Sequence, residues 1–441
     1  MVRQILEAIT RRGLASAVSL GASSYLAHQF GSEGFGAYAG MLAAGQVVLL
    51  FCAFGLEVSP IYMMRTYPDH QRRIWTASLH LSALLAAVCL LLGLALLASP
   101  WQPQYLTRLR EWGWPPFLYA AGMMLLLPQY ACLQGLLQLR AFNSLQVAYP
   151  SIVLITILFV GVGLGRLQPS IAVVAWGCSG LVLAALAAVV AARAVPVNPT
   201  SAASTDPLPW ARFFTLSVQS YIGNCIATLN SRGPTMLVAL TLPAAASGYF
   251  AAAFFLGELF AYFSLAIATV TLPRLAGITH KEHRQRELER ACRVNTTLTM
   301  IAVAVFLLLF NPLSRLLLGS TFSTPSFALM AAVFLGCAIP HSTARLLCTD
   351  LTAQGKPLWN ALPNIPAVVV FVVAHWTLHE RWHVWGAVAA YCASSLVFST
   401  LAFVLYRRHS PIRLTALGLV TRSEAVAAFE LVRQRATGTR R

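Results

Sequence analysis

The chain alternates between long apolar runs and short polar connections along almost its whole length. Each run is close to the ~20 residues that an α-helix needs to cross the hydrocarbon core of a bilayer. Twelve runs predict twelve transmembrane helices, over residues 13–30, 35–58, 74–98, 116–138, 146–165, 170–192, 211–240, 246–272, 296–318, 325–348, 359–378 and 384–406. The pattern therefore predicts an all-α integral membrane protein.

The composition of the 441 residues supports this prediction. Hydrophobic residues make up 58% of the chain and charged residues only 10%, whereas a soluble domain carries about 25% charged residues. So little charge cannot cover the surface of a water-soluble fold of this size. The composition excludes a soluble enzyme, a disordered protein and a nucleic-acid-binding protein.

The distribution of positive charge predicts the orientation of the helices. The chain has 31 Lys and Arg against 14 Asp and Glu, and cytoplasmic connections of membrane proteins are enriched in Lys and Arg. An N-terminus on the cytoplasmic side places 25 of the 31 in cytoplasmic segments. The six others are Arg108, Arg110, Arg166, Arg232, Arg315 and Arg381. Both termini are therefore expected in the cytoplasm.

A Pro- and Ser-rich stretch divides the chain into two halves of six helices each. We expect an N-terminal lobe over 1–195, a cytoplasmic linker over 196–210, a C-terminal lobe over 211–406 and a basic cytoplasmic tail over 407–441. An even number of helices per half gives both halves the same orientation. Two parallel halves with the substrate between them are typical of transporters.

Short similarities between the halves indicate a duplication. Tyr38 near the start of the second helix and Tyr249 near the start of the eighth are offset by 211 residues. The positions 140 and 356, and the prolines at 150 and 366, are both offset by 216 residues. Matching offsets at matching helices predict a pseudo-twofold repeat about an axis along the membrane normal.

Three segments resemble one family. YLAHQFGSEGFGAYAGMLAAGQVVLLFCAFGLEVSP resembles the opening of polysaccharide transporters, PAAASGYFAAAFFLGELFAYFSLAIATVTLPRLAG is similar to their eighth helix, and AQGKPLWNALPNI resembles the turn into their eleventh. The family comprises the flippases of lipid-linked oligosaccharides, such as O-antigen flippases. Its superfamily also holds the multidrug and toxic-compound extrusion (MATE) antiporters. The resemblance covers about residues 5–408.

The resemblance implies a bacterial inner-membrane protein with two six-helix lobes around a cavity that opens to each side in turn. A polyprenyl-diphosphate oligosaccharide combines an anionic diphosphate, a polar glycan and a hydrocarbon tail. Moving its head across the membrane requires a hydrated cavity with cations but no bond making. We therefore expect no catalytic residue, no cofactor and no metal ligand. The expected partners are the lipid-linked oligosaccharide and the bilayer, with polysaccharide polymerase and chain-length proteins as further candidates, and no nucleic acid.

Arg232 and Glu258 are the candidate functional residues in the middle of predicted helices. Ionisable residues at membrane depth usually face a cavity or a partner. Arg232 precedes Gly233-Pro234, which we expect to interrupt the backbone hydrogen bonding of the seventh helix. Its two interpretations are contact with the diphosphate or glycan and a structural ion pair. Glu258 lies at a similar depth on the eighth helix, and either an ion pair or a role in ion coupling fits it.

Further candidates lie at the predicted cytoplasmic ends of helices. Glu57 is a second candidate for pairing or coupling, and Arg65, Arg140, Arg345 and Lys356 form a possible ring of cations around a cavity open to the cytoplasm. The alternative interpretation is that these cations only set topology and anchor headgroups. Asp350 is expected to pair locally with Arg345.

The histidines offer weaker candidates. His80, His341 and His375 could relay protons or be buried structural residues. His379-Glu380-Arg381-Trp382-His383 matches the zinc pattern H-E-x-x-H, but it lies in a short outer connection instead of on one helix. We interpret it as a chance match.

Three other classes of protein compete with a flippase. An ion-coupled drug antiporter of the same superfamily would need a compact acidic site for a cation, and only Glu57 and Glu258 are acidic at depth. A membrane glycan polymerase or transferase would need larger outer loops. A structural membrane subunit has no need of a twofold repeat.

The predicted topology can be tested by thiol labelling. Ser99→Cys and Ser320→Cys, in a background without reactive native thiols, should each react with a membrane-impermeant reagent added from the periplasmic side, because both positions lie in predicted outer connections. Labelling that requires permeabilised cells would contradict the assignment of twelve helices.

Overall fold

The computed structural model describes residues 2–99, 107–195, 210–276, 280–353, 359, 361–409 and 418–420. Within these residues the regular structure is entirely helical. The helices are α1 (Val2–Ala53), α2 (Ser59–Thr66), α3 (Gln71–Ala98), α4 (Thr107–Trp112), α5 (Pro115–Gly135), α6 (Leu139–Leu158), α7 (Pro169–Ala194), α8 (Trp210–Thr241), α9 (Ala244–Ala276), α10 (Lys281–Leu308), α11 (Phe310–Leu318), α12 (Pro325–Ala353) and α14 (Asn364–His409). Short helical turns lie at η1 (Pro68–His70), η3 (Phe159–Gly163) and η5 (Ser320–Phe322).

Eleven of the twelve predicted apolar runs fall mainly on one helix each, and two helices each contain two runs. The run 296–318 covers the end of α10 and α11. α1 turns back at Gly31, whose φ of 59° suits glycine, and α14 turns back at His383, with a φ of 48°. Eight helical stretches of the described chain are long and apolar enough to cross a membrane. The fold is that of an all-α, multi-pass membrane protein. α8 continues through Pro234, so the backbone hydrogen bond that proline cannot donate does not end the helix.

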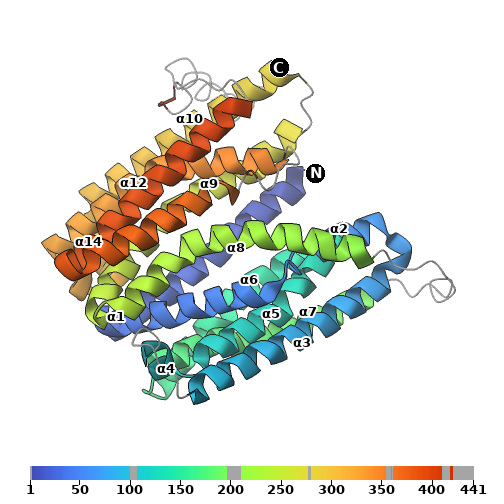
Figure 1. Cartoon of the computed structure of the whole chain (residues 1–441), viewed down its shortest axis with the longest axis horizontal. Coiled ribbons are helices and arrows are strands. Elements are labelled where there is room, and N and C mark those ends of the chain that lie inside the picture. Colours follow the sequence, from blue (N-terminus) through green and yellow to red (C-terminus); the bar gives the residue numbers. More distant parts are fainter. Residues whose placement is uncertain are drawn as a thin grey trace, which may run out of the picture.

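The helices form two lobes that run side by side (Figure 1). α3, α5, α6 and α7 pack on one another and on α1, and these helices form the N-terminal lobe. α9, α10, α12 and α14 pack on one another, with α8 against α9 and α14, and form the C-terminal lobe. The most extensive contacts between the lobes join α1 to α8 and α9.

Two ends of the molecule must be distinguished. We call the end that carries the Gly31 and His383 turns the hairpin end. The opposite end, which carries the N-terminus, α2 and the end of α14 (Figure 1), is the terminal end. The charge distribution predicts that the terminal end faces the cytoplasm.

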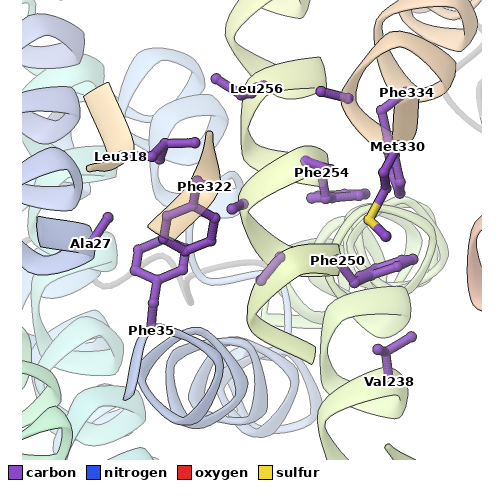
Figure 2. Packing of buried hydrophobic residues seen from close by; sticks show 14 of the residues in the cluster. Ala27, Phe35, Val238, Phe250, Phe254, Leu256, Leu318, Phe322, Met330 and Phe334 are labelled. Atoms are coloured by element: carbon purple, nitrogen blue, oxygen red, sulfur yellow. The ribbon is translucent and has the colours of Figure 1, made fainter. Parts of the chain in front are cut away.

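An apolar core joins the lobes at the hairpin end. One cluster of buried residues includes Leu26 and Phe35 of α1 together with Val238 of α8, Phe250 of α9 and Phe322 of η5. The rings of Phe35 and Phe322 meet edge to face with centroids 6.1 Å apart, and Figure 2 shows them beside one another. The lobes are therefore sealed together at this end by side-chain packing.

Two glycines make this close approach possible. A Cβ added to Gly36 of α1 would collide with the carbonyl of Ala244 and the amide of Gly248, and a Cβ added to Gly248 of α9 would collide with the carbonyl of Ser32. Gly248 follows Gly36 by 212 residues, almost the offset between Tyr38 and Tyr249. The two glycines therefore lie within one residue of matching positions in the predicted repeat.

Polar contacts also join the two lobes at the hairpin end. Arg108 of α4 donates from Nη1 to the carbonyl of Ala239, at 2.7 Å, and to that of Leu242 at the end of α8. A ring nitrogen of His28 in α1 lies 3.0 Å from the carbonyl oxygen of Arg315 in α11. Both contacts connect one lobe to the backbone of the other.

The lobes have separate cores toward the terminal end. A cluster around Leu288 and Leu346 lies wholly within the C-terminal lobe, and one around Leu133 and Leu183 lies wholly within the N-terminal lobe. Contacts between lobes there include the start of α8, where Phe213 packs with Met63 and the carbonyl of Ser217 lies against Gly55. The predicted linker lies outside the described residues except for Trp210, and most of the predicted tail also lies outside them.

The glycine crossing leads to a prediction about stability. Gly248→Leu should lower the free energy of unfolding by about 1–3 kcal/mol, because the side chain has no space beside the Ser32 carbonyl. Gly223→Leu in α8 is the matched control, since nothing lies within 4 Å of an added Cβ there. Thermal unfolding of both purified variants in detergent makes the comparison. Equal loss of stability in the two variants would contradict the close crossing.

Candidate functional site

One face of α8 is polar along the contact with α1. The polar residues recur every three or four positions, which places them on one side of an α-helix. They are Ser217, Tyr221, Asn224, Thr228, Ser231 and Thr235. Residues 221–233 of α8 are all half-buried or exposed, so neighbouring helices do not cover this stretch closely. α8 is also missing from the helices apolar enough to count as candidate spans among the described residues.

Arg232 lies beside this polar face and forms an ion pair with Glu258 of α9. Its Nη1 is 2.7 Å from Oε2 of Glu258, and the two side chains are 36% and 22% exposed. The side chains of Arg232 and Glu258 are only partly buried, so both remain accessible to solvent or to a ligand. Arg232 also interacts electrostatically with Tyr119 of the N-terminal lobe, and Glu258 with Tyr391 of α14.

Two amides connect α8 to its neighbours. Asn224 donates from Nδ2 to Oε1 of Glu57 at 2.7 Å, which links α8 to the segment between α1 and α2. Asn230 donates to Oδ1 of Asn364, at the start of α14, at 2.8 Å. Glu57 and Glu258 therefore lie on different lobes, and each accepts a hydrogen bond from α8.

The tyrosine of the polar face contacts the end of α1. Tyr221 stacks on Phe54 with ring centroids 5.3 Å apart, and its hydroxyl donates to the carbonyl of Phe51 at 3.4 Å. Phe54 and Gly55 both have positive φ values, of 48° and 72°. This local backbone ends α1 and directs the chain into α2.

The predicted ring of cations is only partly brought together. Arg65 at the end of α2 and Arg140 at the start of α6 are exposed at the terminal end of the N-terminal lobe. Arg345 is half-buried on α12, where it interacts electrostatically with Tyr391 and His341. Lys356 lies outside the described residues.

Asp350 has partners that the sequence analysis did not anticipate. Its carboxylate is fully buried and accepts hydrogen bonds from Arg284 at 2.7 Å and from the hydroxyl of Tyr406 at 2.6 Å. These contacts fasten α12 to α10 and α14 at the terminal end. Their residues lie 56 and 66 positions from Asp350, too far apart for a local sequence pattern to reveal.

The histidines have structural contacts. His341 packs on Phe398 with ring centroids 4.7 Å apart, and Nε2 of His375 lies 2.8 Å from the hydroxyl of Thr241. His383 adopts a left-handed conformation at the turn of α14. His379 and His383 therefore do not lie on one regular helix, as the H-E-x-x-H zinc pattern requires.

Comparison with known proteins identifies the family. The model of a family described as "polysaccharide biosynthesis protein" matches residues 26–326. The chain therefore belongs to this family. No curated protein matches the chain by sequence.

Solved structures with the same fold are membrane transporters. A lipid II flippase, MurJ, in an inward closed conformation aligns with a TM-score of 0.69 and 11% identity, over 93% of this chain and 89% of the other. An inward-facing multidrug resistance MATE family transporter of the MOP superfamily aligns with a TM-score of 0.67 and 12% identity, over 91% and 98%. An outward-facing one aligns with a TM-score of 0.60 and 14% identity, over 92% and 95%. The chain therefore shares its fold with these solved transporters.

The Arg232–Glu258 pair can be tested with a double-mutant cycle. Arg232→Ala and Glu258→Ala should each reduce stability, because each leaves a charge at membrane depth without its partner. The double variant should recover part of the loss, with a coupling free energy of ~0.5–3 kcal/mol measured by unfolding in detergent. Strictly additive losses would contradict the contact. A double variant that is stable but inactive would assign Arg232 a role in transport as well.

Proposed function

We propose that this protein is a flippase that carries polyprenyl-diphosphate-linked oligosaccharide across the bacterial inner membrane, by alternating access, for the synthesis of a surface polysaccharide. The observation that carries the proposal is the polar face of α8 with the accessible Arg232–Glu258 pair beside it. Hydroxyls and amides suit the hydroxyl groups of a glycan, and a guanidinium suits a diphosphate. Both chemical features lie between two lobes of a transporter fold.

The charge distribution supports an anionic, lipid-borne substrate. The net charge is +17, and the cations concentrate in segments expected on the cytoplasmic side. A lipid-linked oligosaccharide assembled on that side would meet this basic end first. The hydrocarbon tail needs no protein cavity, since it can remain in the bilayer while the polar head crosses.

The arrangement of the lobes supports a state closed toward the periplasm. The apolar core, the Gly36–Gly248 crossing and the Arg108 contacts all lie at the hairpin end. At the terminal end two cores are each confined to one lobe, and a third takes in Phe213 of α8 from the other lobe. The TM-score is also higher with the inward-facing MATE transporter than with the outward-facing one. We infer that translocation requires the contacts at the hairpin end to open.

A drug antiporter is the second candidate, because the MATE transporter matches the fold almost as well as the lipid II flippase does. Such a pump would use a carboxylate site for a cation. In the structure Glu258 is neutralised by Arg232, and Glu57, which lies in the N-terminal lobe, accepts a hydrogen bond from Asn224. The two carboxylates contact different partners, so the flippase is the better-supported proposal.

The proposal predicts how cells respond to loss of the terminal-end cations. Arg140→Gln combined with Arg345→Gln should stall export of the surface polysaccharide, and polyprenyl-linked intermediates should accumulate on the cytoplasmic face. Arg→Lys at the same positions should rescue only in part, because an ammonium lacks the forked geometry that fits a phosphate. Lipid extraction and surface polysaccharide staining measure both effects.

Arg193→Gln is the matched control, since Arg193 is exposed at the end of α7 and contributes equally to the positive-inside bias. Each variant also requires the thiol-labelling test of topology. Normal export from correctly oriented Arg140→Gln/Arg345→Gln protein would contradict a role for these cations in transport.

A further inference from the structure

A groove lies at the terminal end of the N-terminal lobe, outside the contact between α1 and α8. Its volume is about 490 Å³, within the usual range of small-molecule sites, roughly 300–1,000 Å³. Val58, Ile61, Tyr62 and Arg65 line it from α2 and the residue before it, Gln134 lines it from the end of α5, and Leu139 from the start of α6.

One part of the groove offers hydrogen-bond donors for an anion. The guanidinium of Arg65 and the side-chain amide of Gln134 have no hydrogen-bond or ion-pair partner in the part of the chain that the structure describes. The hydroxyl of Thr66, which also lines the groove, donates to the carbonyl of Tyr62 at 3.0 Å and is not a free donor. No carboxylate is among the lining residues. These features match a phosphoryl group, which accepts hydrogen bonds and carries negative charge.

The other part of the groove is apolar and uncovered. Val58 is 38% exposed, Tyr62 41% and Leu139 42%. The opposite face of α2 is buried, since Met63 and Met64 pack into the core beneath it. α2 therefore presents a second apolar surface next to a cation, a combination that suits a ligand with an anionic head and a hydrocarbon chain.

The position of the groove also suits such a ligand. α2 ends at Thr66, α5 ends at Gly135 and α6 begins at Leu139, so the groove lies where helices end, at the expected depth of lipid headgroups. Arg140 follows Leu139 directly. Arg11 of α1 donates to the carbonyl of Arg140 at 3.2 Å and to the hydroxyl of Ser144, which holds the first turn of α6 beside α1.

We infer that this groove is a docking site for a polyprenyl-diphosphate lipid. The diphosphate would bind to Arg65 and Gln134, and the first isoprenoid units would lie along Val58, Ile61 and Leu139. The site rests on the proposed function and deepens it, because it would hold the substrate at the N-terminal lobe before the head enters between the lobes. A diphosphate fits better than the single phosphodiester of a bilayer phospholipid, since it carries more negative charge for the guanidinium of Arg65 to neutralise.

The inference can be tested by equilibrium binding to the full-length protein in phosphatidylcholine nanodiscs. The probe is radiolabelled farnesyl diphosphate, with inorganic diphosphate and phosphatidylglycerol as competitors. Arg65→Gln should raise Kd by about tenfold or more, because it removes a charge-assisted hydrogen bond. Arg65→Lys should restore only part of the affinity. Leu139→Trp should weaken binding by filling the apolar part of the groove.

Arg72→Gln is the matched control, because Arg72 is exposed at the start of α3 at the same end of the molecule but does not line the groove. It should leave Kd unchanged. Binding that is insensitive to both Arg65→Gln and Leu139→Trp would overturn the inference. Competition by phosphatidylglycerol as strong as that of unlabelled probe would assign the groove to bulk phospholipid. Competition by inorganic diphosphate as strong as that of the probe would exclude a role for the apolar part.

Reconstituted translocation separates this inference from the proposed function. Equal translocation of a polyprenyl-diphosphate oligosaccharide by wild-type protein and Arg65→Gln, at limiting substrate, would contradict the inferred docking site and support the proposed flippase function. If wild-type protein binds the probe through Arg65 and Leu139 but translocates nothing, the docking site is supported and the proposed function is contradicted.

Discussion

A guanidinium in the middle of a membrane-spanning helix must be paired or hydrated, because its unpaired transfer to hydrocarbon costs about 3 kcal/mol or more. Arg232 satisfies this constraint through Glu258 and through partial exposure. The same constraint applies to the polar face of α8, where Asn224, Thr228 and Ser231 could not face lipid without cost. The contact between α1 and α8 therefore has to remain polar. The lobes thus meet along a polar surface, whereas the helices within each lobe pack through apolar side chains.

At the hairpin end, by contrast, the contact between the lobes is mainly apolar. There the lobes approach closely enough for the backbones of Gly36 and Gly248 to meet, and Phe35 packs against Phe322 across the boundary. Close backbone contact through small residues is a usual way to join helices in a membrane, where no hydrophobic effect drives them together. The flippase proposed above would have to break and remake such a contact.

Most of the fold could be predicted from the sequence. Apolar runs of membrane-spanning length identified the helices, and the G-x-E-G-F-G-x-Y segment indicated the family that the comparison shows. The turn of α1 at Gly31 and the turn of α14 at His383 fall between predicted runs. At Gly233-Pro234, where interrupted hydrogen bonding was expected, α8 remains helical on both sides of the proline, because only one backbone donor is missing.

Less of the candidate site could be predicted. The similar depth of Arg232 and Glu258 followed from their positions on adjacent helices, but the partners of Asp350, Glu57 and Asn230 depend on tertiary packing. The polar face of α8 was visible in the sequence as a recurrence every three or four residues. The length and apolar content of the run, which identify it as a helix, do not reveal this face. The groove at Arg65 and Gln134 joins residues 69 positions apart, and no local pattern signals it.

The central claim is that the molecule moves an anionic lipid-linked glycan, and reconstitution tests it most directly. Purified protein in liposomes would be supplied with a fluorescent polyprenyl-diphosphate oligosaccharide, and access of the glycan to a membrane-impermeant glycosidase would be followed over time. The account predicts that wild-type protein exposes the inner-leaflet pool to the enzyme and that protein-free liposomes do not. Absence of translocation, together with ion-driven accumulation of a cationic dye by the same preparation, would contradict it and favour an antiporter.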